Sequence, residues 1–276
     1  MEKKIQYVIE NKVFNFQYEG DTLFGENKVL MNEDINLLSE TDWDIDGYSI
    51  QYFLSDDNVL KVKNGFSELI KSFIIEEGGE INNEFCLEKY HLFVDDDIHL
   101  KISKKIKGGF SVDKFPIDFQ IINNRMSEIL GRIVNTTAEV DDDNLNDFYI
   151  RIVRPNSLKD NNPPHRDVWL DRLRNAINIY YPICGSTIDS ALAILPSSHY
   201  VNESEIERTA EGAFLNDTKY TVPCVISVQN KALNMIRPTP NENEVLIFSP
   251  YLVHGGGYNL NLDQTRISLE VRFWKK

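Results

Sequence analysis

RISLEVRF, residues 266–273, is the stretch that indicates the fold class most clearly, because apolar and polar side chains alternate along it without a break. In a β-strand, every second side chain points to the same face. The apolar side chains would therefore share one face: Ile267, Leu269, Val271 and Phe273. The polar side chains would share the other: Arg266, Ser268, Glu270 and Arg272. This pattern predicts a strand with one face buried in a core.

Several short apolar runs precede this strand, with turn residues between them. They cover residues 148–153, 176–182, 190–196, 219–227 and 244–249. Many short strands at this spacing predict a β-sandwich, a jelly roll or a barrel. Two earlier segments, within 59–73 and 119–133, instead repeat apolar residues with helical period. We predict a mainly β fold with flanking α-helices, in which a cupin-like jelly roll carries the N-terminal helices on its outside.

The chain contains no linker rich in Gly, Ser or Pro, so we predict a single domain over 1–276. Residues 1–147 would form a mostly helical buttress and 148–276 the jelly-roll core, with the acidic run Asp141–Asp143 between them. The acidic stretches 40–46 and 94–99 are expected to be loops. His91 and His99, beside the second of these, are expected at the surface. The segment 200–219 is interpreted as a loop that acts as a lid.

Composition limits the classes of partner. The chain has 276 residues and a net charge of −14, which argues against binding to nucleic acid or to an anionic membrane. It has no apolar run of the roughly 20 residues needed to span a bilayer, and its first residues are not those of a signal peptide. The three cysteines form no paired framework. We therefore predict a soluble, cytoplasmic protein, whose oligomeric state the sequence leaves open.

Three residues have the spacing of a metal site. His165 and Asp167 are two residues apart and would share one face of an extended segment, while His254 follows an apolar strand. Two imidazoles and one carboxylate form the facial triad of non-haem Fe(II) oxygenases, which leaves positions open for a co-substrate and O2. Gly255, Gly256 and Gly257 follow His254 directly and would leave room for that co-substrate.

Arg266 lies twelve residues after His254, at the start of the last strand. If the co-substrate is 2-oxoglutarate, its keto acid end chelates iron and its far carboxylate needs a cation. The planar guanidinium of an arginine pairs with a carboxylate through two hydrogen bonds. Ser268 shares the strand face of Arg266 and would add a hydroxyl donor. We therefore predict that these two residues bind the co-substrate.

Four motifs together resemble the phytanoyl-CoA dioxygenase-like family of Fe(II)/2-oxoglutarate-dependent oxygenases, over roughly residues 148–274. They are HRD (165–167), LPSSH (195–199), HGGGYN (254–259) and TRIS (265–268). The resemblance implies a double-stranded β-helix with iron held by His165, Asp167 and His254, and with 2-oxoglutarate held by Arg266. Tyr180 stands where many members have a Trp facing the co-substrate.

Other candidate residues have weaker support. Asn178 is also predicted to contact the co-substrate, and Trp169 and Arg154 to contact the substrate. Core packing is an equal alternative for Trp169, and a surface salt bridge is one for Arg154. For Arg151 and Arg237, a contact with a ligand and a purely structural role are likewise equal alternatives. His199, in a motif where Ser197 replaces the commoner Gly, is expected to serve a turn.

These observations predict a dioxygenase that hydroxylates a small molecule and releases succinate and CO2. The carboxylate of Asp167 argues against the related halogenases, which lack this ligand. The HRD motif is not that of a protein kinase, because Arg172 stands where the kinase motif needs Asn. The alternatives are a cupin-like metal-dependent isomerase and a carbohydrate-binding jelly-roll protein. The substrate and the choice between hydroxylation and desaturation stay open, although the negative net charge disfavours strongly anionic CoA esters.

Overall fold

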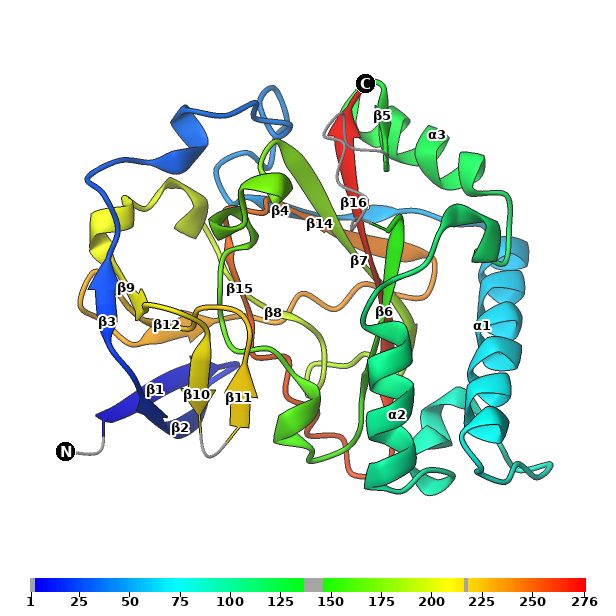
Figure 1. The fold of residues 1–276 in the computed structure, drawn as a ribbon. Helices are drawn as coiled ribbons and strands as arrows, with labels where there is room; N and C mark the ends of the chain where they lie inside the picture. The colour runs from blue at the N-terminus through cyan, green and yellow to red at the C-terminus, as the bar shows by residue number, and fades with distance from the viewer. Residues whose placement is uncertain (1–2, 137–145, 216–217) are drawn as a thin grey trace.

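The computed structural model describes residues 3–136, 146–215 and 218–276. These residues form a mostly β structure with few helices, which confirms the predicted class at this level. One large sheet stands between a helical layer, on the right of Figure 1, and a group of shorter sheets on the left. The predicted separator Asp141–Asp143 lies outside the described residues.

The large sheet has six strands. They are β4 (Tyr48–Tyr52), β14 (Glu244–Phe248), β7 (Ala176–Cys184), β16 (Arg266–Lys275), β6 (Phe148–Val153) and β5 (Val134–Asn135). Strand β16 pairs antiparallel with β7 on one side and with β6 and β5 on the other. All four alternating apolar side chains of this strand are at most 2% exposed, so its predicted buried face is confirmed.

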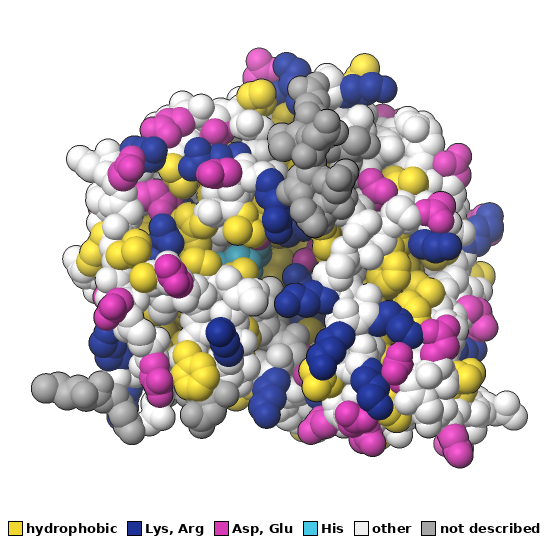
Figure 2. Space-filling view, in the orientation of Figure 1, with side chains coloured by type: hydrophobic (Ala, Val, Ile, Leu, Met, Phe, Trp, Pro, Cys, Tyr) yellow, Lys and Arg dark blue, Asp and Glu magenta, His cyan; other side chains and the backbone are white. Residues whose placement is uncertain are grey.

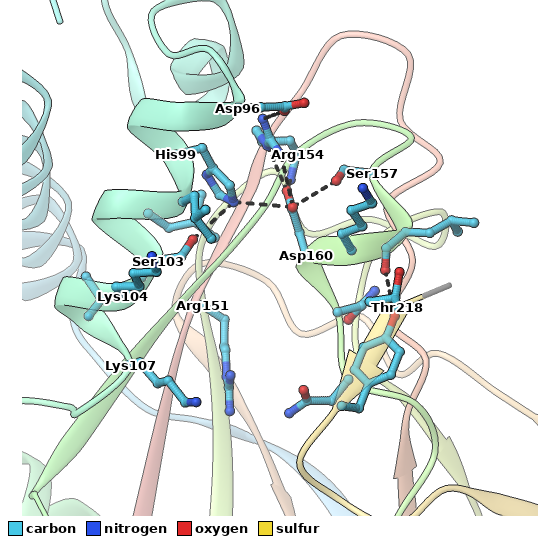
Figure 3. A pocket seen from close by; sticks show the side chains of 18 of the residues that line it. Asp96, His99, Ser103, Lys104, Lys107, Arg151, Arg154, Ser157, Asp160 and Thr218 are labelled. Atoms are coloured by element: carbon cyan, nitrogen blue, oxygen red, sulfur yellow. Dashed lines mark hydrogen bonds and ion pairs between the residues drawn. The ribbon is translucent and has the colours of Figure 1, made fainter. Parts of the chain in front are cut away.

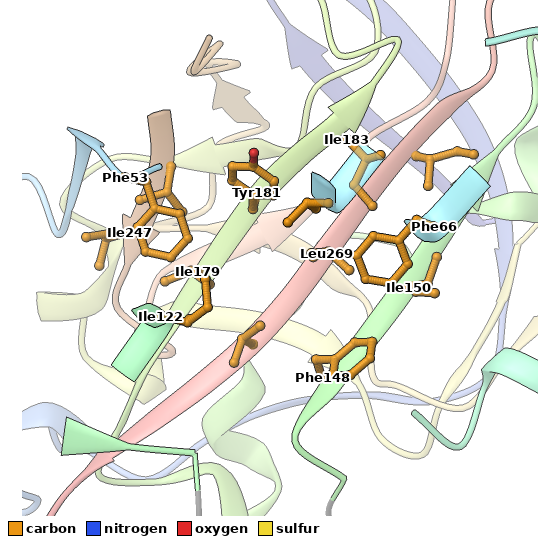
Figure 4. Close-up of a cluster of buried hydrophobic side chains, with 14 of the residues drawn as sticks. Phe53, Phe66, Ile122, Phe148, Ile150, Ile179, Tyr181, Ile183, Ile247 and Leu269 are labelled. Carbon is orange, nitrogen blue, oxygen red and sulfur yellow. The ribbon is translucent and has the colours of Figure 1, made fainter. Parts of the chain in front are cut away.

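Three α-helices cover that buried face: α1 (Asp56–Glu76), α2 (Asp96–Ile106) and α3 (Phe119–Leu130). Figure 4 shows Phe66 of α1 and Ile122 of α3 in one cluster with Ile150, Ile179 and Leu269 of the sheet. The helices therefore occupy one face of the sheet, and the polar side chains of β16 point to the other. No helix within the described ranges is both long and apolar enough to cross a lipid bilayer.

The shorter sheets lie across from that polar face. One contains β1 (Lys3–Ile9), β2 (Lys12–Glu19), β10 (Ala213–Leu215), β11 (Thr218–Tyr220) and β13 (Leu233–Met235); a second contains β3 (Thr22–Phe24), β9 (Ile206–Thr209) and β12 (Val225–Val228); a third contains β8 (Ala193–Leu195) and β15 (Val253–Gly255). They share a second apolar core, which includes Tyr7, Phe16, Val253 and Tyr258. The polar interior between the large sheet and these strands holds the candidate site.

The structure differs from the sequence prediction in the N-terminal part. Residues 3–24 were expected in a mostly helical buttress, but they form β1, β2 and β3. Strand β1 pairs in parallel with β13, and β2 pairs with β10. These partners lie about 200 residues away in the chain, so no local sequence pattern indicates that β1 pairs with β13 or β2 with β10. The two predicted halves are therefore joined within one sheet.

Two segments predicted as loops contain regular structure. Residues 94–99 include the start of α2, because the Asp95 side chain accepts a hydrogen bond from the Ile98 amide (2.8 Å) and caps the helix. Residues 200–219 include β9 and β10, which pair with strands of two sheets, so they are not a simple loop. The run 219–227, predicted as one strand, contains parts of two, β11 and β12.

Candidate metal centre

His165 and His254 face each other across an antiparallel bridge. The amide of each donates to the carbonyl of the other, with N–O distances of 2.8 and 3.0 Å. Their ring centroids are 4.6 Å apart. Gly255 allows this approach: its φ is +123°, and a Cβ there would lie 2.5 Å from the carbonyl oxygen of Pro163. The glycine predicted to make room for a co-substrate therefore makes room for the backbone that carries His165.

Asp167 completes the cluster from a short 3-10 turn, Asp167–Trp169, whose first amide donates to the Pro250 carbonyl (3.1 Å). Its Oδ1 lies 3.4 Å from Nε2 of His165 and 3.6 Å from Nε2 of His254. All three side chains are buried. Among the described residues, this is the only group of three metal-ligating side chains whose ligand atoms lie within 4.8 Å of one another.

The two imidazoles are oriented by the backbone. Nδ1 of His165 lies 2.8 Å from the Pro163 carbonyl oxygen, and Nδ1 of His254 lies 2.9 Å from that of Leu252. A carbonyl can only accept, so each Nδ1 carries the proton and each Nε2 presents its lone pair to the cluster. Burial, followed by the neighbouring His165, lowers the pKa of His254 to about 4. His254 is therefore neutral at pH 7, as a metal ligand must be.

The outer oxygen of Asp167 is held by two donors. Oδ2 accepts from Nδ2 of Asn178 (3.0 Å) and from Nη2 of Arg272 (2.9 Å). Burial alone would raise the pKa of Asp167, but Arg272 and the two histidines outweigh it and hold that pKa well below its usual range. Asn178, predicted to contact the co-substrate, contacts the carboxylate of the cluster instead. Arg272 was not predicted as a site residue, although it lies on the predicted polar face of the strand over 266–273.

Arg266 is buried on the same polar face of β16. Its Nη1 lies 3.2 Å from Oγ of Ser268 and its Nη2 lies 3.3 Å from the Gly257 carbonyl, while Nε has no partner. The guanidinium stands over the ring of Tyr180, 5.8 Å from its centroid. It forms no ion pair with any carboxylate of the described ranges. A buried arginine without an acidic partner is a binding position for an anion.

A second buried arginine, Arg237, lies near Arg266. It donates from Nη1 to the Ala191 carbonyl (3.2 Å) and from Nη2 to the Tyr258 carbonyl (2.9 Å). Burial, followed by the positive charge of Arg266, lowers the pKa of Arg237 to about 10. Within the residues that the structure describes, it too forms no ion pair with a carboxylate. The sequence did not place Arg237 beside Arg266, because nothing local relates the two.

The other predicted residues have structural partners. Trp169 lies in a turn and not in the expected extended segment; its indole donates to Glu203 (3.0 Å), and Arg208 covers its ring. Glu203 also forms a buried ion pair with Arg166. Arg154 pairs with Asp160 (2.9 Å) and with Asp96 (2.7 Å). The structure does not bring Trp169 or Arg154 into contact with the three clustered residues.

Two further histidine predictions have opposite outcomes. His199 lies in the predicted turn, with Nε2 2.7 Å from the Asp44 carbonyl oxygen, and the preceding Ser197 has a φ of +60°. That left-handed φ explains why Gly is the commoner residue there. His99, expected at the surface, is only 5% exposed. Its ring contacts Tyr90, Ser103 and Asp160, because α2 packs it against the segment that follows β6.

Comparisons with known proteins give similarity in structure only. No protein-family model matches the chain, and no curated protein matches its sequence. Among solved structures, the chain is similar to EctD from S. alaskensis, solved with 2-oxoglutarate and 5-hydroxyectoine (13% identity, 93% of this chain and 84% of that chain, TM-score 0.48). It is also similar to AviO1 from Streptomyces viridochromogenes (13% identity, 83% of this chain and 90% of that chain, TM-score 0.45). A third similar structure is that of SnoN, a non-heme alpha-ketoglutarate-dependent epimerase from nogalamycin biosynthesis (10% identity, 84% of this chain and 78% of that chain, TM-score 0.44).

Proposed function

We propose that this protein is an Fe(II)- and 2-oxoglutarate-dependent dioxygenase that hydroxylates a small molecule and releases succinate and CO2. One observation carries the proposal: a buried cluster of two histidines and one aspartate shares a polar interior with a buried arginine that has no acidic partner in the part of the chain that the structure describes. His165, Asp167 and His254 would hold iron, and Arg266 with Ser268 would bind the distal carboxylate of 2-oxoglutarate. We also propose that the large sheet and the strands facing it form a double-stranded β-helix of the phytanoyl-CoA dioxygenase-like type.

The donor set fits ferrous iron. Two imidazoles and one carboxylate oxygen converge, and Oδ1 of Asp167 is turned toward both Nε2 atoms. Three protein ligands leave positions open on an octahedral ion for a chelating keto acid and O2. When bound, iron would supply the activation of O2 and the oxidation of a C–H bond.

The protein's own residues then have separable tasks. Arg272 keeps Asp167 ionised, and Arg272 and Asn178 together hold Oδ2 so that Oδ1 would face the metal. Arg266 and Ser268 orient 2-oxoglutarate by its far end, so that its keto acid end reaches the open positions. Tyr180, which is 1% exposed, covers the guanidinium of Arg266. It would exclude water from the ion pair between Arg266 and the far carboxylate of 2-oxoglutarate.

The test is an anaerobic titration of the metal-free protein with Fe(II) and then with 2-oxoglutarate. Chelation of the keto acid gives a weak visible charge-transfer band, which we expect in the wild-type protein. Arg266→Ala should need far more 2-oxoglutarate to give the band, and His165→Ala should lose it. Arg125→Ala is the control, because Arg125 pairs with Glu128 on the outer helix α3. Metal binding without a band would contradict the proposal and favour a cupin-like metal-dependent isomerase or a carbohydrate-binding protein.

A further inference from the structure

A cavity lies beside the metal centre, between α2, β6 and β11 (Figure 3). Its volume is about 1120 Å³, at the upper end for small-molecule pockets. Residues from these three elements and from the segment after β6 line it, including Lys104, Lys107, Arg151, Lys159 and Lys219. Figure 3 shows Lys107, directly after α2, and Arg151 of β6 extending into the same space.

The cavity adjoins the metal centre at two places. Tyr149, in its lining, lies under the guanidinium of Arg272 (5.5 Å to the ring centroid), and Arg272 holds Asp167. Asn162, also in the lining, accepts a hydrogen bond from the amide of Gly256, two residues after His254. Figure 2 shows Lys and Arg side chains gathered around the central hollow, with a His side chain visible at its edge. A ligand in the cavity could therefore extend toward the metal centre.

The lysines of α2, together with Lys107 directly after its last residue, differ in the direction they face. Lys101 pairs with Asp97 (2.7 Å), and Lys105 pairs with Glu76 and Glu77 (2.6 and 3.0 Å). The other two, Lys104 and Lys107, line the cavity and form no ion pair within the described ranges. Lys159 and Lys219, from the other walls, are likewise without a carboxylate partner among the described residues. Four lysines without a carboxylate partner among the described residues therefore surround one cavity in a chain of net charge −14.

The arginines of the cavity are already neutralised. Arg151 pairs with Glu270 (3.0 Å), and Arg154 pairs with Asp160 and Asp96. The free charge is thus carried by lysine ammonium groups, which are compact point charges that bind phosphate without a fixed planar geometry. Ammonium groups reaching in from several walls can each contact a different oxygen of a phosphoryl group.

We propose that this cavity binds the phosphoryl portion of a phosphorylated small-molecule substrate and presents its carbon skeleton to the metal centre. The assignment of the ligand as substrate rests on the proposed oxygenase function, whereas its binding does not require iron. Lys104, Lys107, Lys159 and Lys219 supply the positive charge. The net charge of the chain, which disfavours anionic substrates, is the sum over the whole surface and does not describe this cavity.

The test is isothermal titration calorimetry of the full chain with inorganic tripolyphosphate. Divalent metals are removed first, because polyphosphate chelates them. We expect saturable binding that weakens as NaCl is raised. The double variant Lys104→Gln/Lys107→Gln should bind roughly fivefold to tenfold more weakly. The matched control Lys101→Gln/Lys105→Gln removes the same charge from the same helix, on the sides that do not face the cavity, and should bind as the wild type does.

Three results would overturn the proposal: no saturable binding, equal weakening in both double variants, or tighter binding of the tricarboxylate tricarballylate than of tripolyphosphate. Circular dichroism of each variant separates loss of binding from loss of folding. The proposed oxygenase function fails by a different observation, the absence of the visible band with Fe(II) and 2-oxoglutarate. Binding of tripolyphosphate without that band would leave the phosphoryl site standing and remove only the oxygenase reaction.

Discussion

Arg272 donates to the outer oxygen of Asp167, with Nη2 2.9 Å from Oδ2, while Oδ1 of the same carboxylate faces the two histidines. The two residues are 105 positions apart in the chain. The ion pair compensates a buried negative charge and at the same time fixes its orientation. It therefore links the central strand β16 to the metal centre.

The first prediction concerns this ion pair. Arg272→Met removes the charge and keeps most of the side-chain volume, so Asp167 should lose its orientation and some of its negative charge. We expect the affinity for Co(II), used as a spectroscopic probe of the site, to fall about 10- to 100-fold. Arg151→Met is the control, because Arg151 pairs with Glu270 and not with Asp167. Equal Co(II) affinity in both variants would show that the ion pair does not position the ligand.

The second prediction concerns the pair of buried arginines. If Arg237 adds to the positive field around Arg266, Arg237→Met should weaken 2-oxoglutarate binding to the iron-loaded protein by roughly tenfold, or about 1.4 kcal/mol. Pyruvate has the same chelating end but no distal carboxylate, so its binding should change little. Titration of the visible band with each keto acid measures the affinity for 2-oxoglutarate and the affinity for pyruvate. A similar loss for pyruvate would instead indicate general damage to the site.

The third prediction concerns the close approach at Gly255. Gly255→Ala places a Cβ against the Pro163 carbonyl at a left-handed φ. The strained φ costs about 1–2 kcal/mol and the overpacking about 1–3 kcal/mol. We expect lower stability in urea unfolding together with weaker metal binding, because His165 and His254 move apart.

Gly20→Ala is the matched control for this variant. Gly20 also has a positive φ, +107°, but a Cβ there meets nothing within 4 Å. The Gly20→Ala variant should lose only the stability that the strained φ costs and should keep its metal affinity. If both variants bind metal equally well, the close approach at Gly255 is not what holds the two histidines together.

The fourth prediction concerns thiol reactivity and pH. Burial raises the pKa of the Cys224 thiol from 9.0 to about 12 and that of Cys184 in the same direction, whereas Cys86 is partly exposed. Because the thiolate is the reactive form, only one thiol should react with Ellman's reagent in the folded protein at pH 8, and three in denaturant. Labelling of Cys224 or Cys184 in the folded protein would contradict this.

The same shift affects stability. A thiol whose pKa is raised on folding favours the folded state below its unfolded pKa, near 9, and that contribution is lost as the pH rises toward the folded pKa of about 12. Stability measured by urea unfolding should therefore decline above about pH 9. Cys224→Ala should show a smaller decline over this range than the wild-type protein.

Local patterns were sufficient for much of the large sheet. The alternation in 266–273 and the apolar runs at 148–153, 176–182 and 244–249 correspond to β16, β6, β7 and β14. Strand β16 carries a period of two because one of its faces lies against the helices. Strands β7 and β14 are buried on both faces, so each reads as a short, nearly continuous apolar run. The N-terminal strands β1 and β2 form a local hairpin across the two-residue turn Glu10–Asn11, and their alternating burial was a signal that the sequence prediction missed. Only their pairing with β13 and β10, from the far end of the chain, has no local signal.

The sequence by itself determined the mainly β class and the three residues, His165, Asp167 and His254, that meet in the cluster. Residue type and spacing limit which side chains can serve as metal ligands, and that information is local. Only the tertiary structure decided that Arg272 holds Asp167, that Arg237 lies near Arg266, and that four lysines without an ion pair in the described ranges surround one cavity. Charge interactions depend on distance through space, and folding brings together residues whose separation along the chain carries no information about that distance.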